Sequence, residues 1–179
     1  MRLRRVLLAA ACAVGLASCG TASAGPPTTT TVAKFTYGMD PSVSAKMICR
    51  HETIADIARV LGVPTTKKPE ATWVRHRYTC PYLYTDGSMT VSVKELPTLA
   101  ATLAYVQGLR VALGDVGSIV NVGQQGFSTT DGSAVTRKDN KVLLVDVKRL
   151  PASFGVPATT RDEVALTVTD IILQCWRGD

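Results

Sequence analysis

The first 18 residues constrain the chain most. They do not contribute to the folded domain, and they determine the compartment in which the rest of the chain folds. Arg2, Arg4 and Arg5 precede an apolar run, residues 6–16, and small residues follow it. This order is typical of a signal peptide, and the run is much shorter than the roughly 20 residues that a membrane-spanning helix needs. We therefore expect residues 1–18 to be removed and the remaining cysteines to enter an oxidising compartment.

The end of this segment carries a more specific pattern. Leu16-Ala17-Ser18-Cys19 places an aliphatic residue and two small residues directly before a cysteine, and it resembles the lipobox of bacterial lipoproteins. The resemblance implies a cell-membrane lipoprotein on the extracytoplasmic side, with Cys19 carrying diacylglycerol and a further acyl chain such as palmitate. Two or three acyl chains anchor a protein firmly, so the lipid bilayer is the first expected partner. The alternative is an ordinary signal peptide with an incidental cysteine.

The composition then divides the chain. Residues 19–38 are rich in Thr, Pro and Ala and lack apolar periodicity, which predicts a flexible tether after the lipidated cysteine. Regular patterns begin afterwards, so residues 39–179 are predicted to form a single domain. Of the 20 Lys and Arg residues, three belong to the signal peptide, which leaves 17 against 14 Asp and Glu. This small excess, outside the cytoplasm, argues against nucleic acid as a partner.

Periodicity within residues 39–179 predicts an α+β domain. Helical spacing of apolar residues marks helices from residues 41 to 61, 97 to 113 and 161 to 175, the last preceded by a capping box at Thr160–Glu163. Alternation and turn residues mark the strands 73–84, 88–93, 118–122, 126–130, 134–137 and 141–147. The order α-β-β-α-β-β-β-(β)-α favours a mostly antiparallel sheet with helices packed on one face.

The periodicity also predicts which positions are buried. The second helix is expected to bury Leu99, Leu103, Val106, Leu109 and Leu113, and the third to bury a stripe that ends at Cys175. Residues 142–145 contain no polar break, so this strand is predicted to be central and covered on both faces.

The cysteines and the strand glycines carry a second resemblance. Cys49 in the first helix, Cys80 within Tyr78-Thr79-Cys80 and the strand around Gly126-Phe127 are similar to features of the small sensor-like domains of actinobacterial envelope lipoproteins. The same features resemble the extracellular domains of mycobacterial receptor kinases. The resemblance covers residues 40–178, and it implies a ligand-sensing or binding module.

Three cysteines, Cys49, Cys80 and Cys175, remain for the folded part once Cys12 is removed and Cys19 is acylated. An odd set in an oxidising compartment predicts one disulfide and one free thiol. We predict the pair Cys49–Cys80, because the first helix is expected to pack on the strand that carries Cys80. The rival pair is Cys49–Cys175.

Catalytic and metal-binding motifs are incomplete. His51-Glu52-Thr53-Ile54-Ala55 begins like a zincin helix, but the second histidine of that motif is replaced by Ala55. Glu52 and Asp56 stand at helical spacing, as on a solvated helix face, and no nucleophile elbow surrounds a serine. We therefore predict no catalytic residue, no metal and no cofactor.

One set of side chains suggests ligand binding. If residues 73–84 form one strand, Trp73, Arg75 and Arg77 share a face, and Tyr82 and Tyr84 lie further along the same strand. Arginines bind carboxylate or phosphate groups, and aromatic rings stack on sugars. The candidate ligand is an envelope glycan, a lipid or a protein partner. The alternative is an exposed strand face with no ligand.

The leading hypothesis is a membrane-anchored, non-catalytic binding or sensor-accessory module. The alternatives are a small envelope enzyme acting on cell-wall or lipid substrates and a lipid carrier. An apolar cavity would favour the carrier, and converging titratable groups would favour the enzyme. A shallow surface of aromatic and basic residues would favour the binding module.

Overall fold

The structure is a computed structural model, and it describes residues 37–119 and 123–176. The chain divides into two units, residues 1–34 and 35–179, and all the described residues belong to the second. The expected signal peptide, Cys19 and the tether up to residue 36 lie outside the described residues. No helix in the described ranges is both long enough and apolar enough to cross a membrane.

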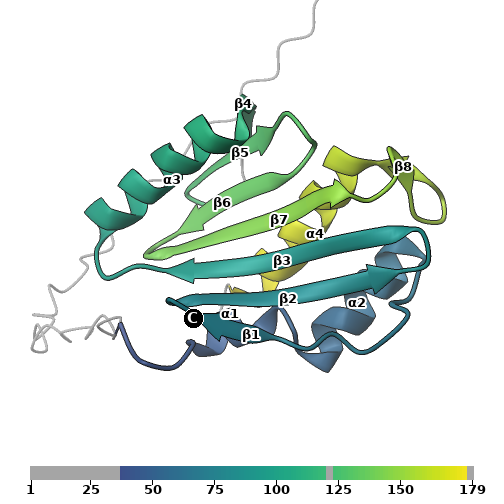
Figure 1. Cartoon of the computed structure of the whole chain (residues 1–179), viewed down its shortest axis with the longest axis horizontal. Coiled ribbons are helices and arrows are strands. Elements are labelled where there is room, and N and C mark those ends of the chain that lie inside the picture. The colour runs from purple at the N-terminus through teal and green to yellow at the C-terminus, as the bar shows by residue number, and fades with distance from the viewer. Residues whose placement is uncertain (1–36, 120–122, 177–179) are drawn as a thin grey trace, which may run out of the picture. The chain divides into compact units, whose positions relative to one another are not determined.

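The main element is an antiparallel sheet of seven strands in the order β1-β2-β3-β7-β6-β5-β4 (Figure 1). Its strands are β1 Thr72–Val74, β2 Arg77–Tyr84, β3 Gly87–Glu95, β4 Asp115–Ile119, β5 Gln125–Thr129, β6 Ala134–Lys138 and β7 Lys141–Arg149. Two further short strands, β8 Ser153–Phe154 and β9 Thr159–Thr160, pair with each other. The predicted α+β class with an antiparallel sheet is confirmed.

Four helices accompany the sheet: α1 Val43–Met47, α2 His51–Leu61, α3 Leu99–Leu113 and α4 Arg161–Cys175. The prediction of one helix over residues 41–61 is wrong, because α1 and α2 are separate and Cys49 lies in the turn between them. Ser42 begins α1, and its hydroxyl accepts a hydrogen bond from the Ala45 amide at 3.1 Å. The capping box predicted at Thr160–Glu163 is present at the start of α4.

The helices pack on both faces of the sheet, so the prediction of one covered face is wrong. On one face α1, α2 and α4 enclose a core that includes Tyr82, Val91 and Leu143. On the other face α3 packs over β5, β6 and β7 and buries a smaller core around Val106 and Phe127. Because β7 is apolar on both sides, as predicted, each side needs a cover.

The rotation of α3 about its axis also differs from the prediction. Val106 is buried and Leu109 and Leu113 pack against the core, but Leu99 and Leu103 are 52% and 43% exposed. Thr102 is fully buried instead, and its hydroxyl bonds to the Thr98 carbonyl at 2.8 Å. Apolar residues occur nearly all around this helix, so their spacing did not define a single buried stripe.

The predicted disulfide is confirmed, with Cys49 and Cys80 joined at a Cα–Cα distance of 5.6 Å. The rival pair is therefore wrong, and Cys175 is a free cysteine. Its predicted burial is also wrong, because Trp176 occupies the buried place at the end of α4. The Trp176 ring is fully buried, and its Nε1 donates to the Ser44 carbonyl at 3.0 Å.

Replacing Cys49 and Cys80 together by alanine is expected to lower the free energy of unfolding by about 3–4 kcal/mol. The bridge joins residues 31 positions apart, so its loss frees a long loop in the unfolded chain. Urea unfolding measures the change. Cys175→Ala is the control and should change stability by less than about 0.5 kcal/mol, because its side chain is exposed. Equal effects of the two changes would contradict this account.

Candidate functional site

A tight turn between β1 and β2 breaks the strand predicted over residues 73–84. Val74 pairs with Arg77, and the two residues between them, Arg75 and His76, have φ angles of 50° and 58°. Glycine and asparagine usually occupy these left-handed positions of a two-residue hairpin turn. Backbone strain of this kind persists only where the surrounding structure holds it, and it is concentrated at functional sites.

Contacts from three segments hold this turn. The Lys94 ammonium donates a hydrogen bond to the Arg75 carbonyl, and the Glu95 amide donates to the His76 carbonyl at 2.9 Å. The His76 ring stacks on Tyr37 with a centroid distance of 4.0 Å. The edge of Trp73 meets the same histidine ring at 5.6 Å. These contacts therefore hold the turn in its strained backbone conformation.

A cavity of about 380 Å³ lies beside the turn, on the sheet face that carries α3. We call it the basic pocket, and its lining residues are Val74, Arg75, Arg77, Thr79, Lys94 and Tyr105. Arg77 and Lys94 are direct cross-strand partners on β2 and β3. Arg77 Nη2 donates to the Tyr105 hydroxyl at 2.6 Å, which links the sheet to α3. The pocket therefore joins three strands and a helix around three positive charges.

No carboxylate lines the basic pocket, and no ion pair among the described residues involves Arg75, Arg77 or Lys94. Burial, and then the charges of Arg77 and Arg75, hold the pKa of Lys94 below its ordinary value. Like charges directly opposite each other also destabilise a sheet. An anion bound among the three cations would relieve this repulsion, so the pocket is suited to a negatively charged group.

The structure separates the five residues proposed from the sequence. Arg75 and Arg77 meet in the basic pocket, but Trp73 pairs with Tyr78 and lies on the opposite face. Its indole Nε1 donates to the Met39 carbonyl at 2.7 Å. The prediction that Trp73 shares a face with the arginines is wrong, because the turn interrupts the alternation.

Tyr82 and Tyr84 lie in the core on the sheet face that α1, α2 and α4 cover, and not in the basic pocket. The Tyr82 hydroxyl donates to the Ile48 carbonyl at 2.5 Å. Burial raises the pKa of both tyrosines well above the ordinary value. These two rings therefore stabilise the fold and do not meet a ligand in the basic pocket.

Sequence reasoning missed Lys94 and Tyr105. The position of Lys94 could have been predicted from the register of the β2–β3 hairpin. The turn that pairs Tyr84 with Gly87 also places Lys94 opposite Arg77. Tyr105 gave no signal, since its place depends on the rotation of α3 about its axis.

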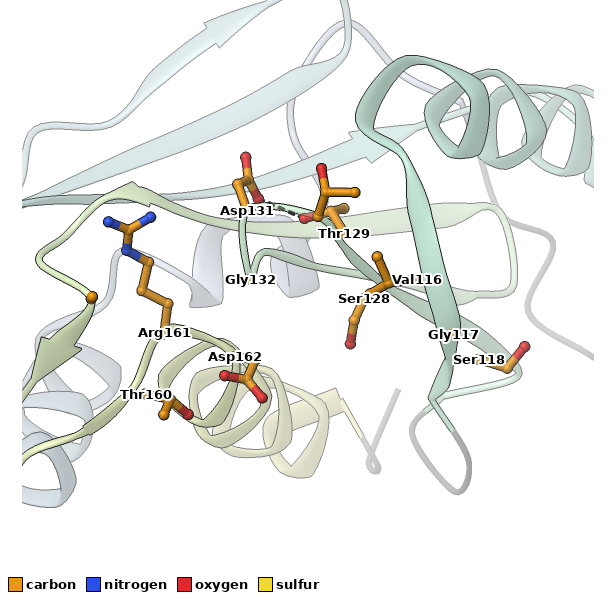
Figure 2. A pocket seen from close by; sticks show the side chains of 12 residues that line it. Val116, Gly117, Ser118, Ser128, Thr129, Asp131, Gly132, Thr160, Arg161 and Asp162 are labelled. Atoms are coloured by element: carbon orange, nitrogen blue, oxygen red, sulfur yellow. Dashed lines mark hydrogen bonds between the residues drawn. The ribbon is translucent and has the colours of Figure 1, made fainter.

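A larger cavity, of about 560 Å³, lies between β4, β5 and the start of α4 (Figure 2). Some of its polar groups are hydrogen-bonded within the protein. Arg161 Nε donates to the Pro151 carbonyl at 3.3 Å, and Thr160 belongs to the capping box. Figure 2 shows the Asp131 carboxylate pointing away from the Ser128 hydroxyl, so these groups do not converge on one ligand.

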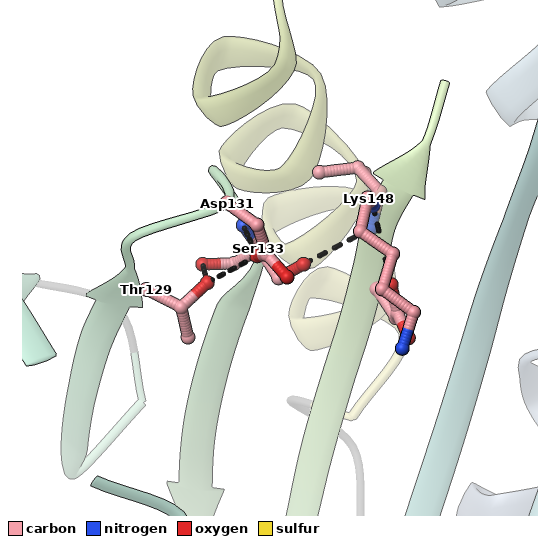
Figure 3. Close-up of polar contacts among 6 residues, drawn as sticks. Thr129, Asp131, Ser133 and Lys148 are labelled. Atoms are coloured by element: carbon pink, nitrogen blue, oxygen red, sulfur yellow. Dashed lines mark hydrogen bonds and ion pairs between the residues drawn. The ribbon is translucent and has the colours of Figure 1, made fainter. Parts of the chain in front are cut away.

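Asp131 itself has a structural role (Figure 3). Its Oδ1 accepts hydrogen bonds from the Thr129 hydroxyl at 2.6 Å and from the Ser133 amide at 3.0 Å. Burial opposes the charge, but these hydrogen bonds and the Lys148 charge keep the pKa of Asp131 below its ordinary value. The carboxylate therefore fixes the turn between β5 and β6.

The other residues weighed for catalysis lie elsewhere. His51 begins α2, and Asp56 pairs with Arg59 at 2.8 Å on the solvent-facing side of the same helix. In residues 37–119 and 123–176, no group of three or more His, Cys, Asp or Glu side chains is placed to hold a metal ion.

Comparisons of the chain with protein-family models, with curated proteins and with solved structures return no match. The site is therefore interpreted from its own geometry and charge.

Arg75→Asn is expected to raise the free energy of unfolding by about 1 kcal/mol. Asparagine accepts the left-handed backbone of this turn, and the change also removes one of three like charges. Thermal unfolding measures the effect. Arg59→Asn is the control and should destabilise, because asparagine is a poorer helix residue. A loss of stability in Arg75→Asn would show that the turn is not strained.

Proposed function

We propose that this protein is a membrane-anchored lipoprotein of the cell envelope that binds an anionic ligand without catalysing a reaction. The observation that carries the proposal is the basic pocket, where Arg75, Arg77 and Lys94 share one cavity that no carboxylate lines. Arginines bind planar or tetrahedral oxyanions through two parallel hydrogen bonds. The strained turn supports the same role, because its conformation places the Arg75 side chain at the cavity.

The composition of the pocket favours binding over catalysis. A hydrolytic enzyme needs a nucleophile and a base within hydrogen-bond distance of each other. The lining offers three cations, a tyrosine, a threonine and a valine, and neither histidine of the chain is among them. Tyr105 and the cations make the aromatic and basic surface that a binding module is expected to have.

A lipid carrier is less well supported. The cavity lined by Val63, Tyr84, Phe154 and Val156 measures about 220 Å³. Ligand sites usually have volumes of roughly 300–1,000 Å³. An acyl chain needs an extended apolar cavity, whereas the basic pocket has Val74 as its one aliphatic side chain.

The proposed anchor predicts that Cys19 is acylated. In membranes of the cells that make the protein, intact mass is expected to show diacylglycerol on the mature chain. A Cys19→Ala chain, exported with an ordinary secretion signal in place of residues 1–18, should lack that mass and leave the membrane fraction. Cys175→Ala in the natural chain should stay anchored. A wild-type chain without acyl mass would contradict the proposal.

The proposed binding role predicts a retained anionic ligand. Native mass spectrometry of protein purified from those membranes is expected to show an added mass, which Arg77→Gln loses because the pocket loses a charge-assisted donor. Arg59→Gln, which removes a distant surface charge, should retain it. Binding should also weaken as pH rises through the pKa of Lys94, since the deprotonated amine no longer attracts an anion. An added mass that survives Arg77→Gln unchanged would contradict this site.

A further inference from the structure

The sheet beside the basic pocket carries a row of hydroxyl groups. Thr72 pairs with Thr79, and Thr79 pairs with Ser92, so the three residues lie side by side across β1, β2 and β3. We call them the hydroxyl row. Arg77 and Lys94 pair two residues further along β2 and β3, on the same face. A strand rises about 3.3 Å per residue, so the hydroxyl row lies about 7 Å from this pair of cations.

Thr72 and Thr79 of the hydroxyl row are accessible to a ligand, whereas Ser92 is buried. α3 packs over β5, β6 and β7, which leaves β1 and β2 uncovered on this face (Figure 1). Thr79 itself lines the basic pocket, so the pocket and the row are continuous. The polar contacts of the neighbouring cations run to Tyr105 and to the Arg75 carbonyl. The hydroxyls of Thr79 and of the exposed Thr72 therefore remain available beside them.

We propose that the ligand is a phosphorylated polyol, such as a sugar or glycerol unit that carries a phosphate monoester. Its phosphate binds in the basic pocket, and its hydroxyl groups bind along the hydroxyl row. This inference rests on the proposed function, because it names the chemical class of the anionic ligand at the same site.

The charge of the pocket favours phosphate over carboxylate. A phosphate monoester carries a charge of about −1.5 to −2 at pH 7 and presents three acceptor oxygens. Arg75, Arg77 and Lys94 supply three positive charges around one cavity. The Tyr105 oxygen accepts from Arg77, which leaves the Tyr105 O–H free to donate to a phosphate oxygen. A carboxylate, with one charge and two oxygens, would leave most of this positive charge unmatched.

The hydroxyl row favours a polyol as the rest of the ligand. Each threonine or serine hydroxyl both donates and accepts, which matches the hydroxyl groups of a sugar or of glycerol. Neighbouring strands stand about 4.8 Å apart, so successive hydroxyls of the row can meet successive groups of an extended ligand. Inorganic phosphate would use the pocket alone and gain nothing from the row.

The test is calorimetric titration of the mature protein in detergent with sn-glycerol 3-phosphate, glucose 1-phosphate, inorganic phosphate, citrate and glycerol. We expect both phosphorylated polyols to bind at least about fivefold more tightly than inorganic phosphate, and glycerol not to bind. Arg77→Gln should weaken all phosphate-containing probes by about tenfold or more, because hydrogen bonds to charged groups contribute about 1.5–3 kcal/mol.

A variant of the hydroxyl row separates the two halves of the ligand. Thr72→Val, an exposed member of the row that does not line the basic pocket, should lower the affinity for sn-glycerol 3-phosphate toward that of inorganic phosphate and leave inorganic phosphate unchanged. Thr90→Val, one row further along the same face and outside the basic pocket, is the matched control and should change neither affinity.

The outcomes distinguish the two levels of the proposal. Equal affinities for inorganic phosphate and the phosphorylated polyols would overturn the polyol, and citrate binding without phosphate binding would overturn the phosphate. Both results leave the anionic site standing. Anion binding that is insensitive to Arg77→Gln would overturn the proposed function itself.

A final arm identifies the source of the polyol phosphate. The unanchored Cys19→Ala chain is mixed with phosphatidylcholine vesicles, with or without phosphatidylinositol 4-phosphate, whose inositol carries a phosphate monoester. Cosedimentation that needs phosphatidylinositol 4-phosphate and is lost in Arg77→Gln assigns a lipid headgroup. Tight binding of the soluble probes without cosedimentation assigns a soluble ligand. If the chain binds neither vesicles nor soluble probes, the phosphorylated polyol is wrong.

Discussion

The burial of β7 on both faces is the constraint from which the rest of the architecture follows. The strand pairs with β3 on one side and β6 on the other, so it joins the two halves of the sheet. Leu143 and Val145 point into one core, while Val142 and Leu144 contribute to the other. Two layers of cover are therefore required, and α3 supplies the second. Because α3 packs mainly over β5, β6 and β7, and reaches β2 through the Tyr105–Arg77 hydrogen bond, it leaves much of the face of β1 and β2 open (Figure 1).

Most of the elements could be predicted from the sequence, because local signals define them. The central position of β7, the capping box of α4 and the Cys49–Cys80 bridge all follow from patterns within a few residues or from the pairing of two elements. The layer to which α3 belongs could not be predicted in this way. An apolar helix with few charges packs equally well on either face of a sheet, and only the tertiary arrangement decides between them.

The candidate site could be predicted only in part, because some of its residues are close in sequence and others are brought there by tertiary packing. Arg75 and Arg77 stand out as two guanidinium groups in a short segment, and both line the pocket. Trp73 was assigned to their face because nothing at Arg75-His76 signals a turn, since neither residue favours a left-handed backbone. Lys94 follows from the register of β2 and β3 once that hairpin is fixed, whereas Tyr105 requires the position of a helix on the opposite side of a core.

Unfavourable features of the structure are concentrated at this site. The turn holds two residues in left-handed conformations, Arg77 and Lys94 stand opposite each other with like charge, and the pKa of Lys94 is lowered. The ends of the first two helices follow local rules: Gly62 supplies the left-handed end of α2, and Ser42 supplies the start of α1. A substitution at Lys94 would remove the like-charge pair and the lowered pKa, and a substitution at Arg75 would relieve one of the two left-handed residues. The coincidence of these features at one cavity costs stability, and it is the arrangement expected if that cavity is the anion site that we propose.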